Sequence, residues 1–244
     1  MSRRLVPLVA LVVLASVPLS AEVPTKTVER TLPLAAGGRL SIDTYKGRVE
    51  VTVWDREETS IRAVVSPDGS CDTSAELVAR TQIRIDGGGP EVRVATDYDD
   101  LPKRVFSFSS DCSSRPFVAY EIRMPRAASL AVDDYKSRIS VEGVGGAVAI
   151  ESYKGTMRLA GLAAPLEIET YKGDVVAELE SLRGPVRVET YKGEVDLVLP
   201  RGAAVSLEER IGRRGSLRSE LTESRGGTRV SVDTNKGTIR LRTR

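Results

Sequence analysis

A five-residue motif recurs along this chain and limits the folds that the chain can adopt. The motif "ETYKG" begins at Glu169 and again at Glu189, and close variants begin at Asp43, Asp133 and Glu151. When the C-terminal half is aligned on this motif, it divides into five repeats of 18 to 22 residues. The repeats span 139–156, 157–174, 175–194, 195–216 and 217–238. A regular period of this length is typical of repeat architectures.

Each repeat combines short alternating strands with a glycine corner. Apolar and polar residues alternate before and after Tyr-Lys-Gly, which is typical of strands that bury one face. The glycine supplies the backbone freedom that a sharp corner requires. An antiparallel sandwich also fits strands of this length, but successive hairpins in a sandwich need not resemble one another. Equivalent residues of a parallel β-solenoid stack directly, so the uniform columns favour an all-β, parallel β-solenoid.

The alternation predicts which residues of the motif face outward. Val188 is expected to point inward, so Glu189 and Tyr191 point outward. The same rule gives a tyrosine column and a neighbouring lysine column, which Tyr45 extends if its coil stacks before that of Tyr135. The expected columns are Tyr135, Tyr153, Tyr171 and Tyr191, and Lys136, Lys154, Lys172 and Lys192. In the last two repeats, Arg210 and Asn235 are expected to occupy the tyrosine column.

The first half of the chain follows a different pattern. Residues 39–55 form one coil of the same kind, and the chain then leaves the repeat until Pro125. We expect a β meander here that caps the stack, with a short helix at 73–80 begun by Thr73. At the other end, alternate arginines in "TIRLRTR" are expected to discourage edge-to-edge pairing. The predicted organisation is a signal peptide (1–21), a first β segment and coil (22–55), a meander (56–125) and the solenoid repeats (126–244).

The N-terminus has the pattern of a secretory signal peptide. Arg3 and Arg4 precede an apolar run from Leu5 to Leu19, which is short for a membrane span, and Ala21 is the expected last residue. Removal of this segment leaves basic and acidic residues in equal number, 34 each. A neutral mature chain gives no support to nucleic-acid binding by bulk charge. The sequence therefore predicts export to the periplasm or cell surface, with no membrane span left after cleavage.

The two cysteines are expected to form a disulfide. Cys71 and Cys112 lie in polar, turn-like sequence, and the predicted compartment is oxidising. A metal site is a weak alternative, because the chain has no histidine and two thiolates alone make a poor zinc site. No cofactor motif is present, and no metal is expected.

Three stretches of the chain have a familiar pattern: "VEVTVWD", "AELVARTQIRI" and above all "VAYEIRMPRAASLAVDDYKSRISVEGVGGAV". Together with the coils that follow, they resemble a bacterial family of exported β-strand-repeat proteins known as adhesins, most of which have no assigned function. The resemblance covers residues 25–244. It implies a β-solenoid, export to the cell envelope, and no catalytic residues. The corner differs, since the family usually places a small residue before the glycine. Ligands of other members therefore do not transfer to the Tyr-Lys-Gly corner.

Two roles are open for the tyrosine and lysine columns. As a structural device, stacked rings and Glu–Lys pairs would hold the coils in register. As a binding strip, they would contact an envelope glycan, an anionic polymer or a protein partner. The basic stretch "RIGRRGSLR" (210–218) is expected to be a solvated loop or an extension of an anion-binding surface. A sensor or accessory subunit of a membrane-bound regulator is a further alternative.

An enzyme is the least favoured reading of the sequence. A polysaccharide lyase built on a β-helix would use Arg or Lys as its base, and this chain has both. An active site, however, brings unlike residues together in a cleft, whereas these columns repeat like residues on a regular face. The absence of histidine removes the commonest acid–base group. The acidic cluster "DYDD" (97–100) is expected to be a solvated turn rather than a calcium site.

Overall fold

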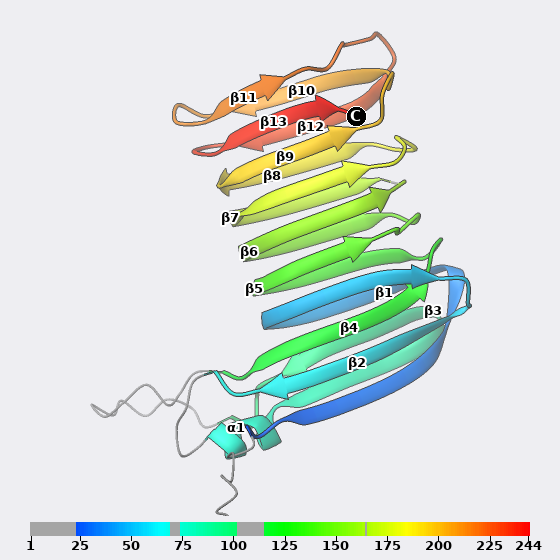
Figure 1. Cartoon of the computed structure of the whole chain (residues 1–244), viewed down its shortest axis with the longest axis vertical. Helices are drawn as coiled ribbons and strands as arrows, with labels where there is room; N and C mark the ends of the chain where they lie inside the picture. Colours follow the sequence, from blue (N-terminus) through cyan, green and yellow to red (C-terminus); the bar gives the residue numbers. More distant parts are fainter. Residues whose placement is uncertain (1–22, 69–73, 102–114, 164) are drawn as a thin grey trace, which may run out of the picture.

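The structure is a computed structural model that describes residues 23–68, 74–101, 115–163 and 165–244. The expected signal peptide, Thr73 and both cysteines lie outside these residues, so the cleavage site, the helix cap and the disulfide stay predictions. Strands hold 71% of the residues and helix 3%, which confirms the all-β class. The strands form one mixed sheet, drawn in Figure 1 with its long axis vertical.

Thirteen strands and one short helix make up the described chain. The four long strands that build the middle of the stack are β1 (Lys26–Trp54), β5 (Ser129–Glu142), β6 (Val148–Leu162) and β7 (Leu166–Leu179). The N-terminal end holds β2 (Glu58–Ser66), α1 (Ser74–Arg80), β3 (Gln82–Asp97) and β4 (Phe117–Pro125). The C-terminal end holds β8 (Val186–Lys192), β9 (Glu194–Leu199), β10 (Val205–Ile211), β11 (Ser216–Ser219), β12 (Thr228–Thr234) and β13 (Thr238–Thr243).

The repeats stack in parallel and in register. β1 pairs with β5, β5 with β6 and β6 with β7, and each pairing places a motif residue beside its equivalent in the next repeat. Lys46, Lys136, Lys154 and Lys172 are consecutive partners in this way. β7 then pairs in parallel with both β8 and β9, because the chain breaks into two strands at the corner of that coil.

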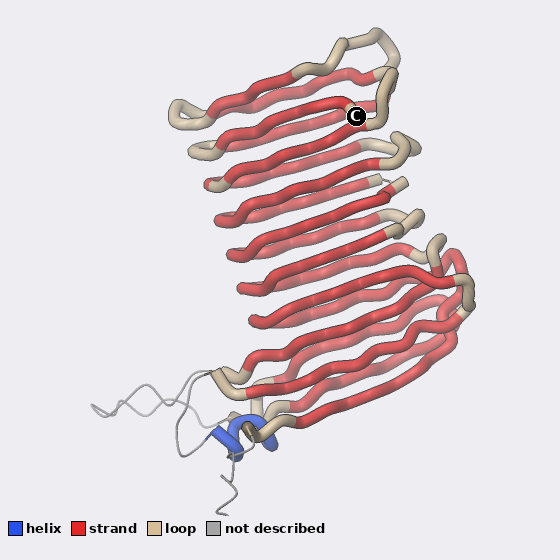
Figure 2. Tube along the Cα trace, in the orientation of Figure 1, coloured by secondary structure: helices blue, strands red, loops and turns tan. Residues whose placement is uncertain are grey.

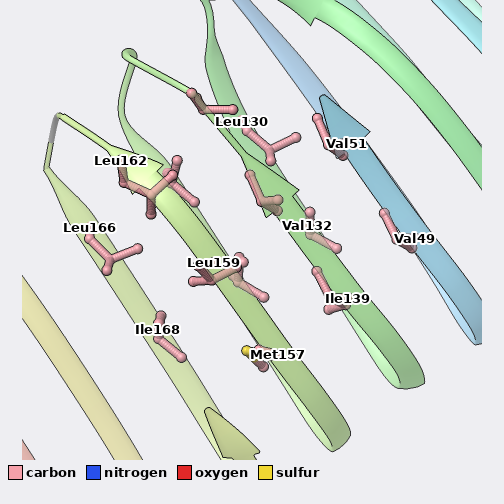
Figure 3. Close-up of a cluster of buried hydrophobic side chains, with 14 of the residues drawn as sticks. Val49, Val51, Leu130, Val132, Ile139, Met157, Leu159, Leu162, Leu166 and Ile168 are labelled. Atoms are coloured by element: carbon pink, nitrogen blue, oxygen red, sulfur yellow. The ribbon is translucent and has the colours of Figure 1, made fainter. Parts of the chain in front are cut away.

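The core is a set of aliphatic columns between the two layers of the stack. Leu130, Val148 and Leu166 are aligned neighbours, and each is at most 3% exposed. Figure 3 shows such side chains pointing into the space between the layers from consecutive strands. Because each strand buries every second residue, the apolar alternation in the sequence is sufficient to build this core.

The corner glycines allow neighbouring coils to approach closely. In Figure 2 the strands of the middle coils continue round the motif corner, whereas loops occupy the opposite side of the stack. A Cβ atom on Gly155 would lie 2.1 Å from the carbonyl oxygen of Ser137, and one on Gly193 would lie 2.0 Å from that of Gly173. Gly155 also has a φ of 154°. The expected sharp turn is therefore a bend within a continuous strand in β1, β5, β6 and β7; β5 has Ser137 at the bend, and at Gly47, Gly155 and Gly173 glycine is needed mainly for space.

The N-terminal end differs from the expected meander. β2 pairs antiparallel with β1 and β4, but β3 and β4 both pair in parallel with β1. Residues 82–97, which lie within the expected meander, form one long strand, β3. The two strands β3 and β4 thus continue the stack beyond β1, and only β2 reverses direction.

At the C-terminal end, the coils do not stack in the order in which they follow one another along the chain. β12 pairs with both β8 and β10, and β13 with both β9 and β11, so the last coil lies between the third and fourth coils of the C-terminal half. Figure 1 shows β10 and β11 at the end of the stack and the C-terminus beside β9 and β13. The expectation that the arginines of "TIRLRTR" protect an edge is wrong. Arg240 and Arg244 instead pair with Glu194 and Glu178 at 2.9 Å, and Arg242 pairs with Asp196.

Candidate functional site

The tyrosines of the motif form a continuous stack of parallel rings. Consecutive ring centroids are 4.7 to 4.9 Å apart from Tyr45 to Tyr191, and consecutive ring planes differ by 4° to 10°. Tyr135, Tyr153 and Tyr171 are each 38% or 39% exposed, which confirms that they face outward. We call this set the tyrosine ladder: Tyr45, Tyr135, Tyr153, Tyr171 and Tyr191.

A cation covers each end of the tyrosine ladder. The guanidinium carbon of Arg115 lies 4.1 Å from the ring centroid of Tyr45, and Tyr98 packs edge-on against the same ring at 6.0 Å. At the other end, Nζ of Lys236 lies 4.9 Å from the ring centroid of Tyr191. The inner rings have both faces occupied by other rings. They can therefore offer a ligand only their edges and hydroxyl groups.

The lysine column runs beside the ladder, and four of its members, Lys136, Lys154, Lys172 and Lys192, form no ion pair within the described part of the chain. Two of them turn back toward their own motif tyrosines, with Nζ of Lys154 at 5.2 Å and Nζ of Lys172 at 5.3 Å from the ring centroids. Lys46 is different, because it is only 7% exposed and pairs with Asp68. We call the four remaining residues the lysine row: Lys136, Lys154, Lys172 and Lys192.

The acids of the motif form a second row on the other side of the ladder. A groove of about 460 Å³ lies along this side and is lined by carboxylates and by tyrosine rings. Its lining includes Asp133, Glu151, Glu169, Glu189, Asp233, Tyr153, Tyr171, Tyr191 and Asn235. Burial, with a contribution from the charge of Asp133, raises the pKa of Asp43 at the end of this row. The ladder thus separates a row of negative charge from a row of positive charge.

A buried polar column lies directly behind the motif. It consists of the small residue of each corner, and all its members are at most 5% exposed: Thr44, Asp134, Ser152, Thr170, Thr190 and Thr234. Asp134 is the one acid among them. Its Oδ2 accepts a hydrogen bond from the Ser137 backbone N–H at 2.8 Å and lies 2.8 Å from the Ser152 hydroxyl. Burial outweighs these bonds and raises the pKa of Asp134.

The basic stretch at 210–218 lies at the end of the stack, and its register differs from our prediction. Arg210 is paired with Asp233, and Asp233 with Glu189, so Arg210 stands in the acid row rather than in the tyrosine column. Its Nη1 lies 3.4 Å from the Asp233 carboxylate. Asn235 occupies the tyrosine column, as expected. The residue next to Asn235 in the neighbouring coil is Gly212.

The "DYDD" turn belongs to the ladder's capped end. Tyr98 packs on Tyr45 and donates a hydrogen bond to the Pro116 carbonyl at 3.0 Å, and Asp97 accepts one from the Asp99 N–H. Among residues whose placement is described, no group of three or more His, Cys, Asp or Glu side chains is arranged to hold a metal ion.

Sequence reasoning missed the residues that close the ladder. Arg115 lies outside the repeats, and nothing in its surroundings marks it as a partner of Tyr45. Lys236 belongs to the aligned Lys column, and the change from Tyr to Asn235 beside it was the available signal. With no ring on Asn235, the Lys236 side chain covers the last tyrosine instead.

Comparison with known proteins supports the fold and no more. No family model matches the sequence, and no curated protein matches it. A crystal structure described as a "putative cell adhesion protein" from Clostridium sporogenes superposes with a TM-score of 0.54 at 11% identity, over 90% of this chain and all of that one. A "putative adhesin" from Bacteroides fragilis matches 90% of this chain and 97% of its own, at 13% identity with a TM-score of 0.37.

The first of these structures is informative about the fold alone. At 11% identity, the Clostridium structure shows a shared fold, and the second similarity is too distant to carry an argument. Within the described residues, no helix has the length and apolar character that crossing a membrane requires. The chain therefore has the fold of a bacterial protein described as a cell adhesion protein, and its site must be judged on its own residues.

Proposed function

We propose that this chain is a non-enzymatic binding protein of the cell envelope, exported and adhesin-like, whose coils act as a short β-solenoid. Its ligand is a linear anionic polymer that lies along the lysine row. The observation that carries this proposal is the row itself: one lysine per coil, outside any ion pair with the described residues, beside a rigid ladder. The tyrosine ladder serves as the spine that fixes the spacing.

The repulsion within the lysine row supports a ligand of opposite charge. Neighbouring coils place like charges in adjacent positions about as far apart as the stacked rings, which are 4.7 to 4.9 Å apart. Like charges directly opposite one another on neighbouring strands destabilise a sheet. A polyanion would relieve this repulsion without any rearrangement of the backbone.

The ladder supports a polymer rather than a small ligand. Because the rings stack on one another, the row of lysines is held straight along four coils. Such a surface offers many weak contacts in a line and no enclosed cavity, which suits a chain-like ligand held by multivalent attraction. The same regularity supports a non-enzymatic role, since unlike groups do not converge at the row.

The proposal is tested by removing the charge of the row. We expect the variant K136Q/K154Q/K172Q/K192Q to bind soluble polygalacturonate at least tenfold more weakly than the parent chain, as measured by biolayer interferometry at low salt. The matched control is R30Q/R123Q/R158Q/R183Q, which removes four exposed arginines that form no ion pair with described residues. Binding of the parent chain should weaken with added salt because screening reduces charge attraction.

Two results would contradict the proposal. If the lysine variant and the arginine control lose polygalacturonate binding equally, binding depends only on the net charge of the protein and not on the lysine row. Release of unsaturated products from polygalacturonate would show that the protein is a lyase. Neutral dextran serves as the polymer control and is expected not to bind.

A further inference from the structure

The acid row and the lysine row have the same spacing, because both take one residue from each coil. Strand pairing aligns every member of a row with the equivalent residue of the next coil. The acid row consists of Asp43, Asp133, Glu151, Glu169, Glu189 and Asp233. Ring centroids along the tyrosine ladder, which stands between the two rows, are 4.7 to 4.9 Å apart. The face at the motif corner therefore carries two straight rows of opposite charge that share one spacing.

The charges in the middle of both rows have no partner of opposite charge within the chain. Among described residues, Glu151 and Glu169 form no ion pair, and neither do Lys154 and Lys172 of the same coils. Like charges that face one another on neighbouring strands destabilise a sheet. A polyanion would relieve this repulsion in the lysine row alone. A surface that carries both rows would relieve it in both.

The acidic groove beside the ladder is suited to the lysine side chains of another molecule. Its volume is about 460 Å³, and Glu151, Glu169 and the ladder tyrosines are part of its lining. Lysine carries a compact charge on a flexible four-carbon stem, so it can reach into such a groove. The central tyrosines of the ladder are 38% or 39% exposed, and tyrosine is enriched at protein interfaces because it combines an apolar ring with a polar hydroxyl.

We infer that this face is a contact surface between two copies of the chain, related by a twofold axis parallel to the stack, with the lysine row of each copy in the acidic groove of the other. Such an axis turns the two faces toward each other and exchanges left and right, but it keeps the direction along the stack. The order lysine, tyrosine, acid of one copy then meets acid, tyrosine, lysine of the other at the same level. A twofold axis across the stack would instead place lysine against lysine.

This arrangement defines the contacts and the size of the assembly. Lys154 faces Glu151 of the partner subunit, and Lys172 faces Glu169 of the partner subunit, and each contact occurs twice. Because both copies use the same surface, association ends at a dimer. Exposed ion pairs are individually weak and are screened by salt, so the dimer depends on their number and on low ionic strength. The inference goes beyond the proposed function, and the partner subunit competes with the polymer for the lysine row.

Charge exchange in the two central coils tests the interface. The variants K154E/K172E and E151K/E169K each place like charges against one another across the axis. We expect each variant alone to dimerise at least tenfold more weakly than the parent chain, as measured by sedimentation velocity over a concentration series at low salt. An equimolar mixture of the two restores opposite charges at every central contact and should form a dimer within about threefold of the parent affinity. Recovery in the mixture also shows that both variants are folded.

The matched control is R123E/R158E, which changes net charge as much as K154E/K172E does, at exposed sites outside both rows. It should still dimerise. Added salt should dissociate the parent dimer, whereas association through a strand edge, which depends on backbone hydrogen bonds, should persist. The inference is overturned by a parent chain that stays monomeric at low salt, by equal loss in the control, by growth beyond a dimer, or by a mixture no stronger than its components.

The variant E151Q/E169Q makes the two proposals fail separately. It neutralises two central acids, which is a milder change than charge reversal, and leaves the lysine row intact. We expect it to dimerise at least tenfold more weakly, while its affinity for polygalacturonate equals or exceeds that of the parent chain. Unchanged dimerisation of this variant contradicts the twofold interface alone. A parent chain that dimerises but does not bind polygalacturonate contradicts the proposed function alone.

Discussion

At the scale of single residues, the outward tyrosines stabilise the fold whether or not a ligand binds. Each inner ring contacts a ring above and a ring below, and stacked pairs contribute about 0.5–1.5 kcal/mol each beyond their buried area. The ladder thus fixes the lateral position of the coils along one corner. A ligand surface built on it gains rigidity from contacts that are already present.

Tyr153→Leu should therefore destabilise the protein although the side chain is 39% exposed. The change removes two ring contacts, so we expect a loss of about 1–3 kcal/mol in the free energy of unfolding, measured by urea denaturation. Val176→Ala, at a similarly exposed position of β7, is the control and should change it by less than about 0.5 kcal/mol. Equal effects of the two changes would argue against a stabilising ladder.

Asp134 is the one acid of the buried polar column, and its charged form opposes folding at neutral pH. Burial raises its pKa above the ordinary value near 3.8, so the folded state disfavours the charged form. Its stabilising contribution is complete below the unfolded pKa and is lost as pH rises through the folded pKa. Thr234 shows the alternative, because its hydroxyl accepts the equivalent backbone bond, from the Gly237 N–H at 2.9 Å.

Asp134→Thr should stabilise the protein at pH 7 and have little effect at pH 3. Threonine removes the buried carboxylate, and we expect its hydroxyl to accept the Ser137 N–H as Thr234 accepts the Gly237 N–H, a bond that the Thr170 and Thr190 hydroxyls do not make. Thermal melts across this range should show a difference in melting temperature that grows as pH rises from about 4. A difference that is constant with pH would mean that Asp134 does not titrate in the way its burial indicates.

At the scale of the coil, the corner glycine decides whether neighbouring strands can meet. A methyl group on Gly155 has no space, because it would face the Ser137 carbonyl oxygen of the preceding coil. The motif thus combines a backbone requirement with three outward side chains and one inward side chain. The coils of β1, β6, β7 and β8 repeat the whole set, whereas the β5 coil has Ser137 in place of the glycine and the last two coils have no tyrosine.

We expect Gly155→Ala to cost about 1–3 kcal/mol of unfolding free energy, since both the φ of 154° and the contact oppose it. The matched control is Gly37→Ala, whose added Cβ would have no atom within 4 Å. Chemical denaturation of both variants measures the difference. A Gly155→Ala chain as stable as the control would show that the coils can move apart at the corner.

At the scale of the whole molecule, the end of the stack is an exposed strand edge. Among described residues, β10 pairs along its length only with β12, and β11 only with β13, apart from one bridge between Val205 and Glu223. Such an edge invites pairing with a second chain, and charged side chains oppose it. Arg213, Arg214 and Arg218 are exposed at this end. We therefore expect these three residues, rather than the C-terminal arginines, to protect the edge.

The variant R213T/R214T/R218T should associate in a concentration-dependent way, detected by light scattering after size-exclusion chromatography. Threonine favours strands and removes the charge that opposes pairing. The control R30T/R123T/R158T changes net charge equally, at sites distant from β10 and β11 in the sheet order. If both variants stay monomeric, the arginines are not needed to protect the edge.

Much of the local structure was predictable because it depends on alternation. The inward Val188 and the outward Tyr191 follow from a period of two, and the helix at Ser74–Arg80 follows from its local pattern. The position of Arg210 was not predictable from the motif alignment. Ile211 pairs with Thr234 in the inward column, and a shift of one residue exchanges the two faces of a strand.

By itself the sequence determined the all-β class, the columns and the outward ladder, because each depends on residues close together in the chain. Tertiary structure alone decided the order of the last two coils and the closure of the ladder by Arg115 and Lys236. Coils with similar columns can pair in either order. The repeat pattern therefore does not predict which coil lies next to which. The ladder would end at Tyr191 in either order, because neither of the last two coils has a tyrosine at its corner; the order decides only that the β12–β13 coil, with Lys236, lies beside Tyr191.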